Sequence, residues 1–378
     1  MKIAVVAGEP SGDFLGGGLI RCLAQRFPHA QFEGVGGPAM QEAGLTSFYP
    51  LSDLSVMGLF EVLRHLPRLL LIRRALTRHW HEQPPDLFIG IDSPDFNLPL
   101  ARRLRASGVT TVQYVSPTVW AWREGRIKTL RAAVDQVLCI YPFEHDYFSA
   151  RNMSSRFVGH PLADSVPLEP DAAAARRELG LGADGLVLAL LPGSRASEIS
   201  RLGPIFLSAL SLILEKLPTL QVVIPCATPA LRHAMEQLIA ERGTQWPVVL
   251  LDGNARAALT AADVGLVASG TATLEALLCR CPAVMAYQVN AFSAAIGRRL
   301  IRVPYFAMPN LMAGEPLIPE FIQEQAKPAA IADAALSWLE NPAQRAAINL
   351  RFADLHRALR RDADASAAAA VSDLLDGH

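Results

Sequence analysis

The sequence predicts an α/β protein made of two Rossmann-like lobes that face a central cleft. Its 378 residues are too many for one ordinary compact core and suit two domains. Short β-branched runs alternate with segments of helical periodicity, as in parallel α/β units. Hydrophobic residues make up 51% and charged residues 19% of the chain, which is enough apolar material for two buried sheets.

The expected strands fall into two groups. In the first half they are residues 2–7, 31–35, 86–91, 110–115, 135–140 and 155–159. In the second half they are residues 185–191, 220–225, 247–251, 264–269 and 282–287. A stretch rich in Pro, Asp and Ala, residues 160–185, separates the groups as a linker with a short helix, and the chain after Lys327 is expected to be helical.

Composition excludes several classes of protein. Lys and Arg number 35 against 36 Asp and Glu, so no global charge favours nucleic acid, and none is expected as a partner. The five cysteines have apolar neighbours and no CxxC spacing, as expected of reduced thiols in a cytosolic protein. The first apolar run is too short for a signal peptide, and no stretch matches a membrane-spanning helix, so we expect a protein that is soluble or rests on a membrane.

Ligands of such sheets bind beyond the carboxyl ends of the strands, so polar residues at strand-to-helix turns are informative. In VASGTATLEALL, residues 267–278, the turn Ser269-Gly270-Thr271 opens a helix, where backbone N–H groups attract a phosphate. Glu275 follows in an apolar run, off the capping-box spacing, and needs a hydrogen-bond partner such as ribose hydroxyls. An ordinary capped helix is the alternative.

LLPGSRASEI, residues 190–199, repeats this pattern at the first strand of the second lobe. Gly193 and Ser194 make the turn, and Arg195 follows where a guanidinium can hold a diphosphate. Alone, this turn would be read as a capped helix with a solvated Arg. Two such turns in one lobe favour a nucleoside diphosphate there.

The first turn of the chain, AGEPSGD, is a poor dinucleotide loop. It lacks GxGxxG, and Glu9 and Asp13 stand where phosphates would approach. Acidic groups suit a hydroxyl-bearing partner, so the second substrate is expected in the first lobe, near Glu9, Ser11 and Asp13. The alternative is that Glu9 and Asp13 only tie the turn.

GIDSPDFN, residues 90–97, ends the expected strand 86–91 with Asp92 and Asp95 on a Pro-containing turn. A carboxylate at such a strand end is placed to accept a proton from an attacking hydroxyl, which makes Asp92 the candidate base, whereas Asp95 is expected to cap the following helix.

After the next strand, Trp120 and Trp122 stand beside Arg123, Arg126 and Lys128, a combination that suits a lipid or sugar phosphate. Buried Trp with solvated Arg is the alternative.

Residues 54–80 combine apolar and basic side chains, as in a helix that rests in the headgroup zone of an anionic bilayer. We expect Pro67 to break this helix and Met57, Leu59, Phe60 and Leu63 to be exposed. A core helix with a basic outer face is the alternative.

Taken together, these stretches resemble the lipid-A-disaccharide synthases, a family of two-lobed GT-B glycosyltransferases. The resemblance runs from residue 7 to about residue 325, in order, and rests on AGEPSGD, GIDSPDFN, YVSPTVWAWR, PFEHDYF, VGHPLAD, LPGSR, ASGTATLE and PNLMAG. It implies transfer of 2,3-diacylglucosamine from UDP to 2,3-diacylglucosamine 1-phosphate, giving the β-1,6-linked disaccharide 1-phosphate and UDP. It also implies inversion at the anomeric carbon, with no metal and no cofactor.

The resemblance further implies roles for single residues. Asp92, with Glu9, belongs to the catalytic group, and Arg195 and Glu275 bind UDP with the two turns. Asn310 of PNLMAG is expected at the reacting centre or on the donor. Trp120, Trp122, Arg123, Ser11 and Asp13 belong to the acceptor or membrane side, as do Met57, Leu59 and Phe60.

The resemblance also implies an arrangement of lobes and a location. An N-terminal acceptor lobe spans residues 1–165, a UDP-donor lobe 166–345, and helices at 346–378 return to the first lobe. The protein is expected in the cytoplasm, peripherally bound to the cytoplasmic face of the inner membrane, and a homodimer is left open.

Two other classes share parts of this pattern. A UDP-sugar epimerase has the same fold and donor turns without a lipid-facing surface. A non-catalytic UDP-lipid binding protein needs the turns but no base at Asp92.

Overall fold

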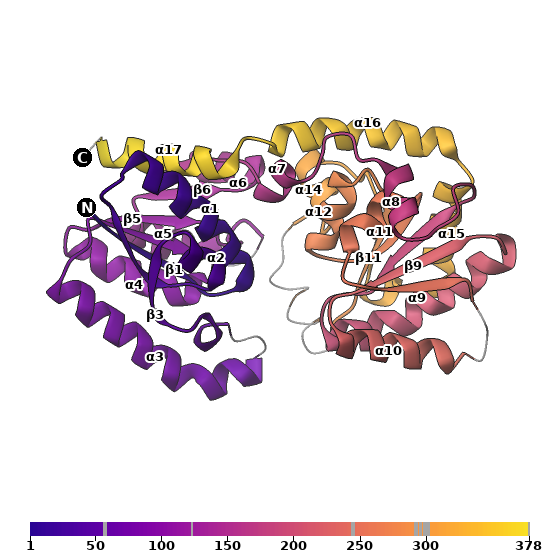
Figure 1. Cartoon of the computed structure of the whole chain (residues 1–378), viewed down its shortest axis with the longest axis horizontal. Helices are drawn as coiled ribbons and strands as arrows, with labels where there is room; N and C mark the ends of the chain where they lie inside the picture. The colour runs from indigo at the N-terminus through magenta and orange to yellow at the C-terminus, as the bar shows by residue number, and fades with distance from the viewer. Residues whose placement is uncertain are drawn as a thin grey trace. The chain divides into compact units, whose positions relative to one another are not determined.

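The computed structural model describes residues 1–55, 59–121, 124–242, 246–290, 294, 297 and 303–376, without the side chains of residues 59–64 and 124. The chain forms two compact units (Figure 1). The first unit comprises Met1–Asp164 and Leu359–His378, and the second comprises Ser165–Ala358. The expected return to the first lobe at residue 346 falls inside one helix, α16 (Pro342–Leu359), which belongs to the second unit up to Ala358.

The first unit is built on a seven-stranded parallel sheet of order β3-β2-β1-β4-β5-β6-β7. Its strands are β1 (Lys2–Ala7), β2 (Gln31–Val35), β3 (Leu45–Tyr49), β4 (Leu87–Ile91), β5 (Thr110–Tyr114), β6 (Gln136–Cys139) and β7 (Ser155–Phe157). All but β3 were predicted. The strand order reverses between β1 and β4, so the loops after these two strands diverge and leave room for a ligand.

Helices cover both faces of this sheet. They are α1 (Pro10–Arg26), α2 (Pro38–Glu42), α3 (Leu59–Glu82), α4 (Pro94–Ala106), α5 (Ile127–Ala133), α6 (Pro142–Ser149), α7 (Pro161–Ser165) and α17 (Ala363–Asp376). Alternate residues of β1 face opposite cores: Ile3, Val5 and Ala7 pack with α1 and α17, whereas Ala4 and Val6 pack with α3 and α4.

The glycines of α1 serve helix packing. A Cβ at Gly17 would lie 2.8 Å from the Ala39 carbonyl oxygen, and one at Gly18 would lie 2.0 Å from a carboxylate oxygen of Asp364. Glycine at 17 is therefore required for α2 to lie this close to α1, and glycine at 18 leaves room for the Asp364 carboxylate of α17. Figure 1 shows α17 in yellow beside α1.

The second unit has a six-stranded parallel sheet of order β10-β9-β8-β11-β12-β13. Its strands are β8 (Val187–Leu191), β9 (Gln221–Cys226), β10 (Val248–Asp252), β11 (Val264–Ala268), β12 (Ala283–Tyr287) and β13 (Glu320–Ile322). The short edge strand β13 was not predicted. Its helices are α8 (Ala172–Glu178), α9 (Ala196–Lys216), α10 (Pro229–Ala240), α11 (Ala255–Ala261), α12 (Thr271–Leu278), α14 (Met308–Ala313), α15 (Pro328–Leu339) and α16.

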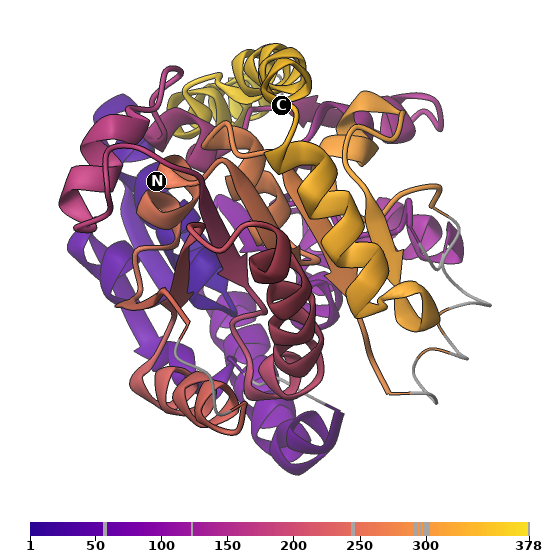
Figure 2. The same ribbon diagram turned by 90° about the vertical axis from the view of Figure 1, so that its right-hand side faces the viewer.

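Helix α9 alone, among the described residues, is long and apolar enough to cross a membrane, which the sequence had not led us to expect. It packs against α10, α15 and β11 (Figure 2), and its side chains Leu202, Phe206 and Leu210 are buried. These contacts are those of a core helix.

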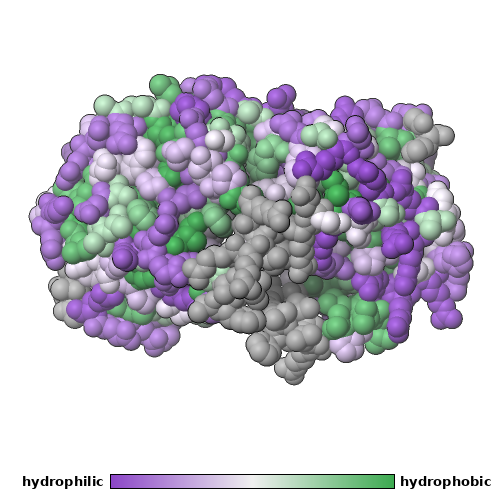
Figure 3. All heavy atoms as spheres, turned by 180° about the vertical axis from the view of Figure 1, so that it is seen from behind, coloured by the Kyte–Doolittle hydropathy of each residue, from purple (hydrophilic) through white to green (hydrophobic). Residues whose placement is uncertain are grey.

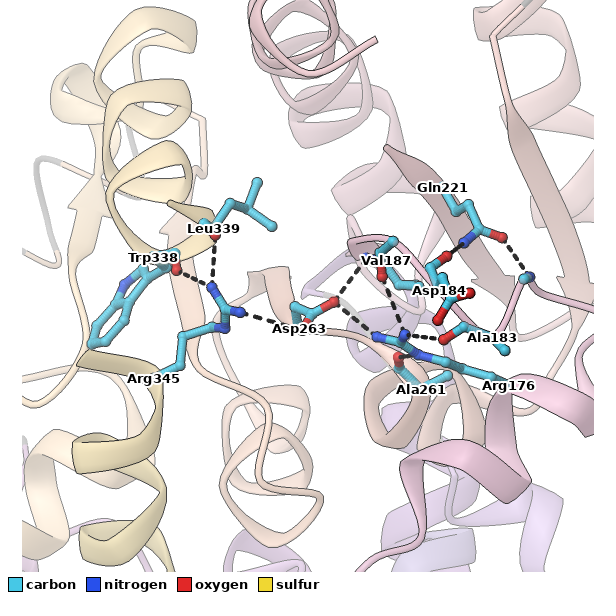
Figure 4. Close-up of polar contacts among 12 residues, drawn as sticks. Arg176, Ala183, Asp184, Val187, Gln221, Ala261, Asp263, Trp338, Leu339 and Arg345 are labelled. Carbon is cyan, nitrogen blue, oxygen red and sulfur yellow. Dashed lines mark hydrogen bonds and ion pairs between the residues drawn. The ribbon is translucent and has the colours of Figure 1, made fainter. Parts of the chain in front are cut away.

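A buried ionic network joins the linker helix α8 and helix α16 to this sheet (Figure 4). Asp263, just before β11, accepts hydrogen bonds from Arg176 of α8 at 2.9 Å and from the Val187 backbone N–H at 2.9 Å. Its other oxygen lies 3.6 Å from Arg345 of α16, which also donates to the carbonyls of Trp338 and Leu339. Arg345 explains why α16 starts within the second unit.

We expect Asp263→Ala to lower the free energy of unfolding by about 3 kcal/mol, because it leaves two largely buried guanidinium groups without their carboxylate. Urea denaturation of the full chain measures this loss. The matched control is Asp252→Ala, whose exposed ion pair with Arg232 is expected to contribute less than about 1 kcal/mol. Equal effects of the two substitutions would contradict the assignment.

Candidate functional site

The second unit has a pocket at the carboxyl ends of β8 and β11. Its volume is about 330 Å³, and both predicted turns line it, Gly193-Ser194-Arg195 and Ser269-Gly270-Thr271, together with Glu275. The structure thus brings together the expected UDP-binding residues except Asn310. Because β8 and β11 are parallel neighbours, their following turns lie at the same sheet edge.

In the first turn, Gly193 has a φ of 134°, a conformation that side chains rarely adopt. Arg195 occupies the N-cap position of α9 without a side-chain cap, and its side chain is exposed. Ser194 and Arg195 both contact Glu198 of the same helix: the Ser194 N–H donates to its carboxylate at 2.9 Å, and the guanidinium of Arg195 does so at 3.3 Å.

In the second turn, Gly270 has a φ of 122° and precedes α12. Gly270 and Thr271 are exposed, whereas Thr273 is completely buried. Its hydroxyl donates to the Gly270 carbonyl at 2.8 Å and accepts from the Met308 N–H at 3.0 Å. The small polar residues thus have two tasks: Gly270 and Thr271 present backbone to the pocket, and Thr273 anchors the turn to α14.

Glu275 has a protein partner where the sequence suggested a ribose. Its carboxylate lies 3.6 Å from Nε of Arg256 and is mostly buried, with the side chain 20% exposed. Burial raises the pKa of Glu275, and Arg256 opposes that rise. Glu275 still lines the pocket, so the ion pair with Arg256 stabilises its charge without removing it from the site.

Asn310 has a structural task in α14. It is fully buried, and its amide donates to the Ile318 carbonyl and to Glu320, each at 2.8 Å, and accepts from the backbone N–H groups of Leu317 and Ile318, each at 2.9 Å. Glu320 in turn accepts from the Phe306 and Ala307 N–H groups. Asn310 therefore exposes no atom to the pocket, contrary to the direct donor contact that we expected.

In the first unit, Asp92 directly follows β4 in a strained turn. Asp92 and Ser93 have φ values of 50° and 39°, in the left-handed region that non-glycine residues avoid. The Asp92 carbonyl holds the turn by accepting from the side-chain amides of Asn97 and Gln113, each at 2.9 Å. A Cβ at Gly8 would lie 2.1 Å from the Ser93 hydroxyl oxygen, so glycine at 8 is required for this turn to fit.

A second pocket, of about 340 Å³, surrounds Asp92. Asp92 and Glu9 line it on one side, and Leu66, Leu69, Leu70 and Arg73 of α3 line it on another. Burial raises the pKa of Asp92, and the Ser93 backbone N–H opposes that rise. Apolar side chains and one cation therefore lie beside a carboxylate of raised basicity. From the sequence, the leucines and Arg73 were assigned to a membrane surface, not to a pocket with Asp92.

Asp95, which we expected to cap α4, lies in the first turn of that helix, and Ser93 is at the cap position. Asp95 forms an ion pair with Arg126.

Asp13 has the structural task that the sequence left open. Its buried carboxylate accepts hydrogen bonds from the backbone N–H groups of Gly37, Ala39 and Met40, at 2.7 to 3.1 Å, and so caps the start of α2. Ser11 is exposed on the first turn of α1. These three hydrogen bonds and the burial of Asp13 favour the structural alternative over the expected acceptor contact.

Trp120 belongs to a partly buried cluster after β5 and β6. Its indole N–H donates to Glu144 of α6 at 3.2 Å, and its ring packs edge-on against Phe143. Glu144 is 3% exposed, and burial raises its pKa to about 8. Burial also lowers the pKa of His160 to about 4. Trp122 and Arg123 lie outside the described residues.

Helix α3 continues through Pro67, so the expected break is wrong. Met57 and the side chains of Leu59, Phe60 and Leu63 lie outside the described part of the chain. Further along the helix, Leu66 and Leu71 are 41% and 58% exposed. On the face seen in Figure 3, described apolar and hydrophilic residues are interspersed.

Comparison with known proteins shows to which family the chain belongs. A model of the lipid-A-disaccharide synthetase family matches residues 3–371. The chain belongs to this family. A lipid-A-disaccharide synthase of Chromohalobacter salexigens is 50% identical over 99% of this chain and 97% of its own length. Lipid-A-disaccharide synthases of Alkalilimnicola ehrlichii, 49% identical, and Pseudomonas aeruginosa, 48% identical, cover 98% and 100% of the chain, and 98% of each relative is covered. This chain is therefore a glycosyltransferase, and the epimerase alternative is not favoured.

Solved structures with low sequence identity to this chain show the same fold. A UDP-GlcNAc 2-epimerase from Neisseria meningitidis bound to UDP-GlcNAc aligns over all of both chains with a TM-score of 0.64 and 12% identity. The glycotransferase of kitacinnamycin aligns over 98% of both chains with a TM-score of 0.61 and 18% identity. The two-lobed α/β fold that the sequence predicted is confirmed.

Glu144 makes stability depend on pH. Its pKa is raised from 4.5 in the unfolded chain to about 8 when folded, so the folded state binds more protons between these values. The stability contributed by the protonated form is fully present below pH 4.5 and is lost as pH rises to about 8. We therefore expect Glu144→Gln, which resembles that form, to flatten the decline in unfolding free energy between pH 5 and 8.

Urea denaturation at each pH measures this slope. Asp146→Asn changes an exposed carboxylate on the same helix and is expected to leave the slope unchanged. An equally steep decline in Glu144→Gln contradicts the assignment.

Proposed function

We propose that this chain is an inverting glycosyltransferase that joins UDP-2,3-diacylglucosamine to 2,3-diacylglucosamine 1-phosphate and releases UDP. The observation that carries the proposal is the chemistry of the two pockets. One has two helix-opening turns and an Arg, which suit a diphosphate. The other sets a carboxylate of raised pKa beside leucines and an Arg, which suits a lipid-bearing sugar phosphate.

The second unit binds the donor in this proposal. Arg195 and the backbone N–H groups of the turns at Ser194 and Gly270 hold the diphosphate. Glu275 accepts hydrogen bonds from the ribose hydroxyls, and its ion pair with Arg256 keeps the carboxylate in position. Asn310 has a positioning role, because its hydrogen bonds hold residues 317–320 against α14.

The first unit supplies the base. Asp92 accepts the proton of the acceptor's 6-hydroxyl while the oxygen of that hydroxyl forms a bond to the anomeric carbon of the donor. The bond from that carbon to the diphosphate oxygen breaks, and UDP leaves with the electron pair. A carboxylate with a raised pKa is a stronger base than an ordinary one, which is what the step requires. Arg73 is placed to meet the acceptor phosphate, and Leu66, Leu69 and Leu70 its acyl chains.

Asp92→Asn is expected to lower kcat by about 10² to 10⁴, because the amide cannot accept the proton, while UDP affinity stays unchanged. Product analysis with radiolabelled donor measures turnover and separates the disaccharide from an epimerised sugar or no product. The acidic limb of the wild-type pH profile is expected above the ordinary aspartate range. Near wild-type turnover in the variant would move the role to another carboxylate, with Glu9 next.

We also propose that the enzyme is cytoplasmic and rests peripherally on the cytoplasmic face of the inner membrane through α3. Exposed Leu66 and Leu71 support this, since they share the helix with Arg68, Arg73 and Arg74. The same helix lines the pocket around Asp92, so a lipid acceptor has a short path from bilayer to base.

Leu66→Ser combined with Leu71→Ser is expected to reduce sedimentation with anionic liposomes and to raise the KM for the lipid acceptor, since both leucines lose contact with acyl chains. The control pair, Leu212→Ser with Leu350→Ser, removes exposed leucines of the second unit and should change neither. Thermal unfolding checks that each double variant folds. Unchanged sedimentation of the α3 variant rules out this membrane contact.

A further inference from the structure

The donor pocket contains a second carboxylate, Glu198, that the proposed mechanism does not use. It stands in the first turn of α9 and lies over the turn at Gly193-Ser194-Arg195. One oxygen accepts from the Ser194 N–H at 2.9 Å, and the other lies 3.3 Å from the Arg195 guanidinium. These are the groups assigned to the donor diphosphate, and a single side chain holds both.

The position of Glu198 is built into the turn. A Cβ at residue 193 would lie 2.4 Å from Cβ of Glu198 and 2.5 Å from its carboxylate. Such contacts are shorter than carbon atoms tolerate, so only glycine at 193 lets the carboxylate lie over the turn. The side chain of Glu198 is only 20% exposed, and its charge is therefore only partly screened by solvent.

The charges around the pocket give this placement a consequence. Among the described residues that line it, Arg195 is the one basic residue, whereas Glu198 and Glu275 are both acidic. Arg256 already pairs with Glu275. A diphosphate that enters therefore meets more acidic than basic side chains among the described residues. It can bind Arg195 and the Ser194 N–H only when Glu198 no longer contacts them.

We infer that Glu198 is an internal anion that competes with the diphosphate for Arg195 and the Ser194 N–H, and thereby limits the affinity for the donor and for UDP. This rests on the proposed function of the pocket. The competition lowers the affinity for both diphosphates and favours release of UDP after transfer, because the carboxylate takes back the groups that held the leaving group. A role in helix capping alone would need an acceptor oxygen at this place but no charge.

Glu198→Gln in the full chain separates the two roles, because glutamine keeps an acceptor oxygen for the Ser194 N–H and removes the charge. Calorimetry is expected to show about tenfold tighter binding of UDP, with binding of uridine unchanged because uridine has no phosphate. Arg195→Ala is expected to change UDP binding in the opposite direction, about tenfold weaker or more. Glu241→Gln, an exposed change at the end of α10, is the matched control and should alter neither affinity.

Unchanged or weaker UDP binding in Glu198→Gln overturns the inference, since the carboxylate then only caps α9 or steers Arg195 toward the diphosphate. If that variant does not fold, Glu198→Ala removes the charge and the acceptor oxygen together, and tighter UDP binding is expected for it as well. A failure of the unsubstituted protein to bind UDP is a different result. It overturns the proposed donor site itself, before any variant is compared.

Discussion

The parallel direction of every strand pair in both sheets is the constraint on which the site depends. Parallel strands send all their carboxyl ends to one edge, so residues far apart in sequence, such as Arg195 and Glu275, line one pocket. The amino ends gather at the opposite edge, and there the second unit places its ionic network around Asp263. The pocket and the ionic network of the second unit therefore lie at opposite edges of its sheet, and a substitution at one edge need not disturb the other.

The turn after β4 shows what a reactive position costs. Two successive left-handed residues, Asp92 and Ser93, each carry strain of about 1–3 kcal/mol. Hydrogen bonds from Asn97 and Gln113 to the Asp92 carbonyl offset part of that strain, and neither of these two bonds uses the carboxylate. The absence of a side chain at Gly8 is equally necessary, because Ser93 occupies that space.

The sequence predicted most strands and both donor turns, since apolar runs followed by glycine and small polar residues have a local signature. It did not reveal the edge strand β3, whose run LTSFY mixes polar and apolar residues, or the edge strand β13, whose three residues EFI are too few for a recognisable pattern. Nor did it show that Asp13 differs from Asp92: both follow strands in acidic turns, and only the tertiary contact with α2 shows that Asp13 accepts three backbone hydrogen bonds. The sequence also did not predict that α3 lines the pocket around Asp92, because the apolar pattern of a helix does not indicate which strand end the helix faces.

The last helix determines when the first unit can be completed during synthesis. Ala367, Ala368, Ala370 and Val371 of α17 are fully buried in the core beside α1. A ribosome releases these residues only after the whole second unit has been made, so until then one face of the first sheet lacks the part of its cover that α17 provides beside α1. The unit that begins the chain is thus the last to be finished, and nascent chains carry exposed apolar surface for most of translation.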